Sequence, residues 1–421
     1  GTDGRFKNEV KDFAGAKVKP IENPQLADIE VIKHLAGKGL LYAKEKFVHS
    51  YPHCWRCDTP LLNYATSSWF VEVSKFRDRL VEVNKKIKWV PEEVGDGRFG
   101  KWLEGARDWA ISRSRFWGAP LPVWKCNSCP EKEFIGSVDE IKARTGGRNK
   151  FVVTRHGEAE SNVLQILSSN PKTKHHLTEN GREQAKVAGE KLINSDLLTK
   201  ESKKVDIIYC SPFLRTKETA EIIAEQLGYP KNKIVYDDRL HEIYVGEMDG
   251  KPEAEYQAFF GQRIEKFSKT PKGGENHTTV KNRMTEFLYD VDKKHEGKNI
   301  LVVSHNTPIW LMFAGVYGMT PEVAVKMRTP GKPFIVNSDV IEIPFAPIPH
   351  NRNYELDMHR PFIDEITLRC KCGGEMKRVP EVFDCWFESG SMPFAESHHP
   401  FENINKFNPE KGLGYPADFI A

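Results

Sequence analysis

The sequence predicts an α/β protein with a doubly wound, mostly parallel sheet, placed within a second region of different character. Short apolar runs at 151–154, 205–209 and 300–303 are typical of buried strands. Stretches with helical periodicity separate these runs, and strands that alternate with helices form parallel sheets covered on both faces. The 421 residues suffice for about two or three domains.

Two helices are predicted between the apolar runs. Thr178 is a suitable N-cap for a helix that carries Ala185 and Leu192 on one face. A second helix over 216–227 should end before Gly228. Since ligands bind at the carboxyl ends of parallel strands, reactive side chains are expected directly after the runs.

Composition narrows the functional classes. A net charge of +3 is too small to indicate nucleic-acid binding by itself. No apolar run reaches the roughly 20 residues of a membrane span, and the polar start lacks a signal-peptide core. The cysteines occur mostly in close pairs without a secretion signal, so we expect a reducing, cytoplasmic setting. The ends at Gly1 and Ala421 indicate a piece of a longer chain.

Residues suited to phosphoryl transfer follow the predicted strands. Arg155 and His156 follow the first run, Arg215 the second and His305 the third. A neutral imidazole can attack phosphorus, while guanidinium groups bind the phosphoryl oxygens in a planar fork. Glu242 can protonate the leaving oxygen. Each residue alone is also compatible with a surface position, but the ordered set is specific.

This ordered set resembles the histidine phosphatase superfamily, which includes the cofactor-dependent phosphoglycerate mutases. The resemblance covers about 200 residues and includes the turns at 177–181 and 273–275. It implies that His156 becomes phosphohistidine, that Glu242 is the general acid and then the base, and that no metal is needed. The residues expected to bind the phosphoryl group or the substrate are Arg155, Arg215, His305, Asn162 and Gly157.

The resemblance leaves the reaction and its substrate open. The short stretch between Glu242 and Gly273 favours hydrolysis of a phosphorylated small molecule over mutase chemistry. Ala159 and Asn276 replace the family's frequent Thr and Ser, which leaves substrate preference undecided. A catalytically silent appendage that positions tRNA is a further alternative.

Different motifs lie on either side of this region. They are YPHCWRCDTP at 51–60, WLEGARDWAISR at 102–113, VFDCWFESGS at 382–391 and YPADFIA at 415–421. These strings resemble the isoleucyl-tRNA synthetases, a family of class I aminoacyl-tRNA synthetases with a Rossmann-type core.

The resemblance implies a division of the chain. Residues 1–50 would be the tail of an editing domain, and 51–147 a catalytic-core segment with the first half of a zinc ribbon. Residues 148–352, here called the insert, would be the phosphatase, and 353–421 the second half of the ribbon with more core. The parent chain would use tRNA(Ile), isoleucine, ATP and Mg²⁺. The family's ATP-phosphate motifs lie outside this segment, so it is not expected to activate isoleucine alone.

Four cysteines bracket the insert and form a candidate zinc site. Cys126 and Cys129, together with Cys370 and Cys372, can offer four thiolates to one tetrahedral structural Zn²⁺. Without the insert, about 40 residues separate the two pairs, a normal ribbon spacing that argues against an artefactual gene join. Reduced, unpaired cysteines are the alternative. Of the others, we expect Cys385 to be buried.

Overall fold

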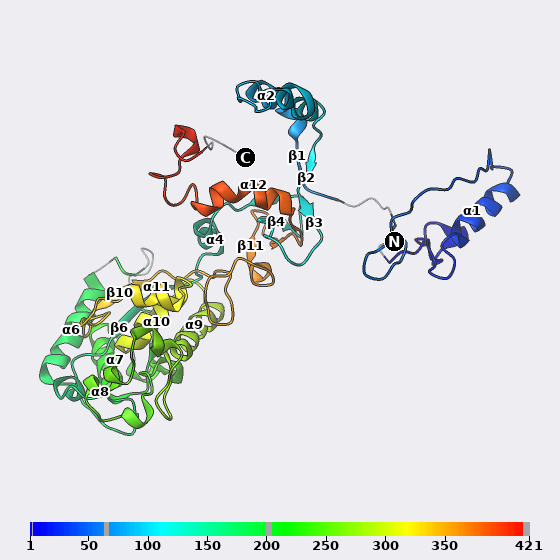
Figure 1. Ribbon diagram of the computed structural model, residues 1–421. Helices are drawn as coiled ribbons and strands as arrows, with labels where there is room; N and C mark the ends of the chain where they lie inside the picture. The colour runs from blue at the N-terminus through cyan, green and yellow to red at the C-terminus, as the bar shows by residue number, and fades with distance from the viewer. Residues whose placement is uncertain (2, 63–66, 195, 199–203, 416–421) are drawn as a thin grey trace. The chain divides into compact units, whose positions relative to one another are not determined.

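A computed structural model describes residues 1, 3–62, 67–194, 196–198 and 204–415. The chain divides into two compact units, Gly1–Trp69 and Phe70–Ala421 (Figure 1). The described part of the first unit contains one α-helix, α1 (Leu26–Gly37), preceded by a 3-10 turn at Lys11–Phe13. Among the described residues, no helix combines the length and the apolar character needed to cross a membrane. The predicted motif at 415–421 lies mostly outside the described residues.

The insert contains a five-stranded sheet with the order β10-β6-β9-β7-β8. Four of its strands are parallel, and β10 pairs with β6 in the antiparallel direction. The three predicted runs correspond to β6, β7 and β9, which confirms the mostly parallel sheet. The strands are β6 (Lys150–Arg155), β7 (Ile207–Cys210), β8 (Val235–Tyr236), β9 (Asn299–Ser304) and β10 (Val340–Ile343).

Helices cover both faces of this sheet. They are α5 (Glu160–Val163), α6 (Glu179–Asn194), α7 (Leu214–Gln226), α8 (Glu253–Ala258), α9 (His277–Lys294), α10 (Asn306–Val316) and α11 (Pro321–Lys326). The predicted N-cap is present at α6, where the Thr178 hydroxyl accepts from the backbone N–H of Gly181 at 3.0 Å. Leucine and alanine side chains of α6 are buried at helical spacing, as the sequence predicts.

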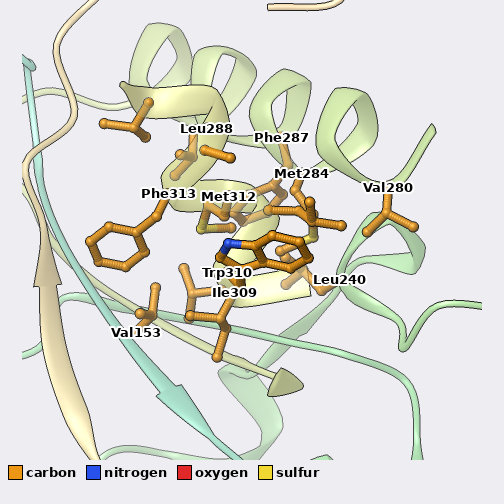
Figure 2. Close-up of a cluster of buried hydrophobic side chains, with 14 of the residues drawn as sticks. Val153, Leu240, Val280, Met284, Phe287, Leu288, Ile309, Trp310, Met312 and Phe313 are labelled. Atoms are coloured by element: carbon orange, nitrogen blue, oxygen red, sulfur yellow. The ribbon is translucent and has the colours of Figure 1, made fainter. Parts of the chain in front are cut away.

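Alternate residues of each strand enter two separate cores. Phe151 and Val153 of β6 belong to a core with residues of α9 and α10, whereas Val152 belongs to a core with residues of α6 and α7. This alternation follows from the two-residue period of a strand. Figure 2 shows Trp310, Met312 and Phe313 of α10 inside the larger core. Full burial of each such side chain contributes about 1.5–3 kcal/mol.

The ribbon is a separate four-stranded antiparallel sheet with the order β11-β12-β4-β5. Trp124 of strand β4 is completely buried, and its indole N–H donates to the carbonyl of Ile366 at 2.8 Å. The β4–β5 hairpin precedes the insert and the β11–β12 hairpin follows it. The strands and the covering helix are β4 (Val123–Cys126), β5 (Lys132–Phe134), α4 (Val138–Thr145), β11 (Thr367–Arg369) and β12 (Glu375–Arg378).

The two ends of the insert lie side by side. Phe151 of β6, near the entry, pairs with Ile343 of β10, near the exit. Just before the entry, the hydroxyl of Thr145 donates to the carbonyl of Pro347 at 2.9 Å. A domain whose ends meet can be placed in a surface turn without separating the host segments.

The other elements of the second unit are short. They are β1 (Phe70–Val71), α2 (Arg77–Asn84), α3 (Gly100–Glu104), β2 (Trp109–Ala110), β3 (Ser112–Arg113), β13 (Val382–Phe383) and α12 (Cys385–Glu396). Helix α12 has no buried residue, so the expectation that Cys385 is buried was wrong. Cys385 is the first residue of α12, and it stays exposed because no other segment in the described part of the chain covers it.

Candidate active site

His156 lies directly after β6 and is almost completely buried. Its backbone N–H donates to the carbonyl of Ser304 at 3.1 Å, which joins it to the end of β9. Its Nδ1 lies 2.7 Å from the carbonyl oxygen of Gly157. Because a carbonyl only accepts, Nδ1 carries the proton and Nε2 keeps its lone pair. Burial, with the charges of Arg215 and Arg155, lowers the pKa of His156 well below its ordinary value and keeps the ring neutral.

Arg215, in the first turn of α7, is held from several sides. Its Nε donates to Nε2 of His156 at 3.2 Å, and one terminal nitrogen donates to Nδ1 of His305 at 3.2 Å. Ser168 accepts two further bonds from the guanidinium, at its hydroxyl (3.1 Å) and its carbonyl (3.0 Å). Burial lowers the pKa of Arg215 to about 10, so the group remains a cation at neutral pH.

His305 follows β9 and is completely buried. Its Nε2 lies 2.8 Å from the hydroxyl of Ser211, which follows β7. Arginine has no acceptor, so Nδ1 of His305 must accept from Arg215 and the ring proton lies on Nε2. Burial lowers the pKa of His305 well below its usual value, with Arg215 adding to the effect. The rings of His156 and His305 meet edge to face at 5.2 Å.

Glu242 and Arg155 complete the set. The Glu242 carboxylate lies 3.9 Å from Nδ1 of His305, and its side chain is 20% exposed. Burial raises the pKa of Glu242 above its ordinary value, although the nearby cations oppose the shift. Arg155 donates to the carbonyl of Ile335 at 3.3 Å, while its buried Nε lacks a partner among the described residues. Four of the five residues singled out from the sequence line one pocket, and His305 lies behind it in contact with Arg215.

Gly157 and Asn162, which were expected to bind substrate, also make contacts within the fold. A methyl group at Gly157 would collide with the backbone of Gly181, so glycine is required for packing against the 177–181 turn. Binding of phosphate near Gly157 stays a prediction. Asn162 accepts from the backbone N–H of Ala159 at 3.0 Å through its side-chain oxygen, and the same side chain lines the pocket.

The pocket continues into a larger cavity. An inner cavity of about 200 Å³ is lined by His156, Arg215 and Glu242. An outer cavity of about 650 Å³ shares eight of the inner cavity's lining residues. Sequence reasoning missed several groups here, because no motif marks them: Ser168, Glu253, Lys266, His277 and Arg328.

The four ribbon cysteines form a single cluster. Their sulfur atoms all lie within 4.8 Å of one another, and this is the one group of three or more potential metal ligands among the described residues. The sulfurs of Cys126 and Cys372 are 3.6 Å apart, and those of Cys129 and Cys370 are 3.7 Å apart. Tetrahedral thiolates at 2.3 Å from a zinc ion lie about 3.8 Å apart. The cluster therefore fits a tetrahedral metal ion.

Two family models match different parts of the chain. Residues 151–331 match the model of the histidine phosphatase superfamily (branch 1). Residues 11–175 and 340–421 match the tRNA synthetases class I (I, L, M and V). The two matches overlap at 151–175, and the synthetase match also includes 340–343, the residues of β10. The structure places both β6 and β10 in the phosphatase sheet, so these segments belong to the insert.

Curated relatives are isoleucine–tRNA ligases. That of Treponema denticola is 49% identical over 418 residues, covering 99% of this chain and 18% of the relative. That of Clostridium tetani is 49% identical over 420 residues, covering 100% of this chain and 20% of the relative. The chain therefore spans about a fifth of the length of these relatives.

Two solved structures illustrate what the chain is similar to. A mycobacterial glucosyl-3-phosphoglycerate phosphatase complexed with VO3 is 22% identical, with a TM-score of 0.38, over 46% of this chain and 91% of that one. Bacillus stearothermophilus YhfR is 26% identical, with a TM-score of 0.38, over 46% of this chain and 90% of that one. From the family matches, the chain belongs to the class I tRNA synthetases (I, L, M and V) and carries a histidine phosphatase domain within it.

Proposed function

We propose that the insert hydrolyses phosphomonoesters through a phosphohistidine on residue 156. The observation that carries this proposal is the neutral, buried imidazole of His156, whose Nε2 lone pair faces the guanidinium of Arg215 at 3.2 Å. A neutral imidazole is a nucleophile, and a guanidinium beside it places the phosphoryl oxygens next to the attacking nitrogen.

The reaction has two steps. Nε2 of His156 attacks phosphorus while the bond to the leaving oxygen breaks, and Glu242 donates its proton to that oxygen. A water molecule then attacks the phosphohistidine, Glu242 takes the proton from this water, and inorganic phosphate leaves. Arg155 and Arg215 stabilise the charge on the equatorial oxygens throughout. His305 positions the guanidinium of Arg215 by accepting its hydrogen bond, and Asn162 contacts the substrate.

The test is turnover of p-nitrophenyl phosphate by the purified chain, with His156→Ala as the inactive variant. His176→Ala is the matched control, because His176 is exposed and pairs with Glu218 away from the cavities. We expect an acid-labile phosphate on the native chain and none on His156→Ala. Absence of both turnover and phosphohistidine in the native chain would instead support a silent appendage, whereas phosphoryl transfer to a second substrate would support a mutase.

For the flanking region we propose a segment of an isoleucine–tRNA ligase, with the domain limits 1–50, 51–147, 148–352 and 353–421. The parent chain would join isoleucine to tRNA(Ile) with ATP and Mg²⁺ in the cytoplasm, and this segment alone would not. Supporting this are the family match of both flanks and the identity of 49% to isoleucine–tRNA ligases.

We propose zinc as the metal of the four-cysteine cluster. The thiolates of Cys126, Cys129, Cys370 and Cys372 would hold it, and a closed four-thiolate set supplies structural stability rather than catalysis. The ion would join the two hairpins on either side of the insert.

A further inference from the structure

The outer cavity carries an excess of positive charge. Its cationic lining residues, set against the single carboxylate of Glu253, are Arg155, Arg263, Lys266, Arg328 and Lys332. Within the described residues, none of these five cations lies within ion-pair distance of a carboxylate. Elsewhere in the insert, by contrast, Arg283 pairs with Glu275 at 3.0 Å. Uncompensated cations around a cavity favour an anionic ligand.

Lys266 is the most buried of these cations, at 8% exposure. Its ammonium group donates to the side-chain oxygen of Gln257 at 2.6 Å and lies 4.9 Å from the ring centre of Tyr256. Burial, with the charges of Arg328 and Arg263, lowers the pKa of Lys266 to about 8. Among the described residues this ammonium group has no carboxylate partner, so a bound anion would stabilise its protonated form.

Two neighbouring nitrogens lack hydrogen-bond partners. Nε1 of Trp310 and Nδ1 of His277 are both buried, and neither has a partner among the described residues. The two rings meet edge to face at 5.1 Å, and the guanidinium of Arg328 lies 5.1 Å from the Trp310 ring centre. Both residues line the outer cavity. An indole N–H only donates, and a buried donor without a partner costs about 1–3 kcal/mol.

We propose that the outer cavity is a second anion site, which binds a carboxylate or a second phosphate on the same substrate whose phosphomonoester lies against His156. Lys266 and Arg328 supply the charge, and Lys266, Arg328 and His277 line both cavities. One small molecule can therefore reach from the nucleophile to these cations. The inference rests on the proposed phosphatase function and adds a substrate class: phosphomonoesters with a separate anionic group.

Matched substrate pairs test the site. 3-Phosphoglycerate and glycerol 3-phosphate differ by a carboxylate, while fructose 1,6-bisphosphate and fructose 6-phosphate differ by a phosphate. In at least one pair, we expect the native chain to favour the more anionic member about tenfold or more in kcat/KM. The pair that shows the preference identifies the anion.

Variants then locate the effect. In Lys266→Met and in Arg328→Met, the ratio of kcat/KM values for the two members of a pair should fall towards one. A general loss of activity lowers both values and leaves this ratio unchanged. Lys326→Met is the matched control, because Lys326 is exposed at the end of α11 and does not line either cavity. Circular dichroism identifies a variant that fails to fold. If one of the two methionine variants is unfolded, the substrate preference of the other tests the site.

A binding measurement separates this inference from the phosphatase function. Calorimetric titration of the His156→Ala chain with the same pairs needs no turnover. Tighter binding of the more anionic member, lost in the double variants with Lys266→Met or Arg328→Met, supports the second site even if the native chain hydrolyses nothing. Equal affinities and equal kcat/KM values within both pairs would overturn the second site while leaving the phosphatase intact.

Discussion

Nε of Arg215 donates to Nε2 of His156 at 3.2 Å, while the same guanidinium donates to Nδ1 of His305. One cation thus connects residues that follow β6 and β9. The geometry orients both imidazoles through their lone pairs and keeps them neutral, since a second proton on either ring would face the guanidinium of Arg215. The proposed nucleophile, His156, therefore needs no separate base to remove a proton from its attacking nitrogen.

Arg215→Lys tests this arrangement. An ammonium is a compact point charge and cannot contact both imidazoles and Ser168 at once as the planar fork does. We expect kcat on p-nitrophenyl phosphate to fall by about 10²-fold, comparable to loss of one donor in an oxyanion site. Arg182→Lys, on the half-exposed surface of α6 beside Glu218, should retain activity. Full activity in Arg215→Lys would show that the fork does not position the phosphoryl group.

The raised pKa of Glu242 predicts the pH dependence. Its acid form extends to higher pH than that of an ordinary glutamate, whose pKa is 4.5. Phosphorylation of the enzyme needs this proton, so for poor leaving groups the rate of that step should decline as pH rises through the raised pKa. In Glu242→Gln this decline should disappear together with most of the activity.

A good leaving group provides the control for that measurement. 2,4-Dinitrophenyl phosphate needs little protonation, so Glu242→Gln should phosphorylate His156 with it at closer to the native rate. Pre-steady-state release of dinitrophenol measures this step. An equal loss with both leaving groups would assign Glu242 to structure and not to proton transfer.

Gly181→Ala should destabilise the insert. An alanine inside a helix normally stabilises by up to about 1 kcal/mol relative to glycine. Here its methyl group would collide with the backbone of Glu158, next to the nucleophile loop. We expect a net loss of about 1–3 kcal/mol, seen as a lower thermal unfolding temperature.

Gly261→Ala is the comparison for that variant. A methyl group there would lie 3.4 Å from the end of the flexible Glu265 side chain, so the unfolding temperature should change little. If both alanine variants unfold at the native temperature, the contact between Gly181 and Glu158 is looser than the structure shows.

The zinc proposal predicts about one zinc per chain, measured by plasma mass spectrometry. Cys372→Ser should lose most of it, because a hydroxyl is a poor ligand for zinc in a thiolate site. Cys385→Ser removes an exposed cysteine outside the cluster and should keep the metal. Removal of zinc by a chelator should leave phosphatase activity intact. A loss of activity in parallel with the loss of zinc would contradict a metal-free phosphoryl site.

Local patterns in the sequence were enough for much of the fold. Apolar runs such as 151–154 identify strands because burial on both faces excludes polar residues. Thr178 marks the start of α6 because its hydroxyl supplies an acceptor that the first helical turn lacks. Strands β8 and β10 were not predicted, since β8 has two residues and the order of strands depends on contacts between distant segments.

The sequence by itself determined which side chains are candidates for the phosphoryl chemistry, because Arg155, His156 and His305 stand at the ends of recognisable strands and the ordered set resembles a known family. Only the tertiary structure decided what surrounds them. The role of Ser168, the need for glycine at 157 and the cationic outer cavity depend on segments far apart in the chain meeting in space. These tertiary contacts depend on side-chain packing and on loop conformations, which no local pattern in a single sequence predicts.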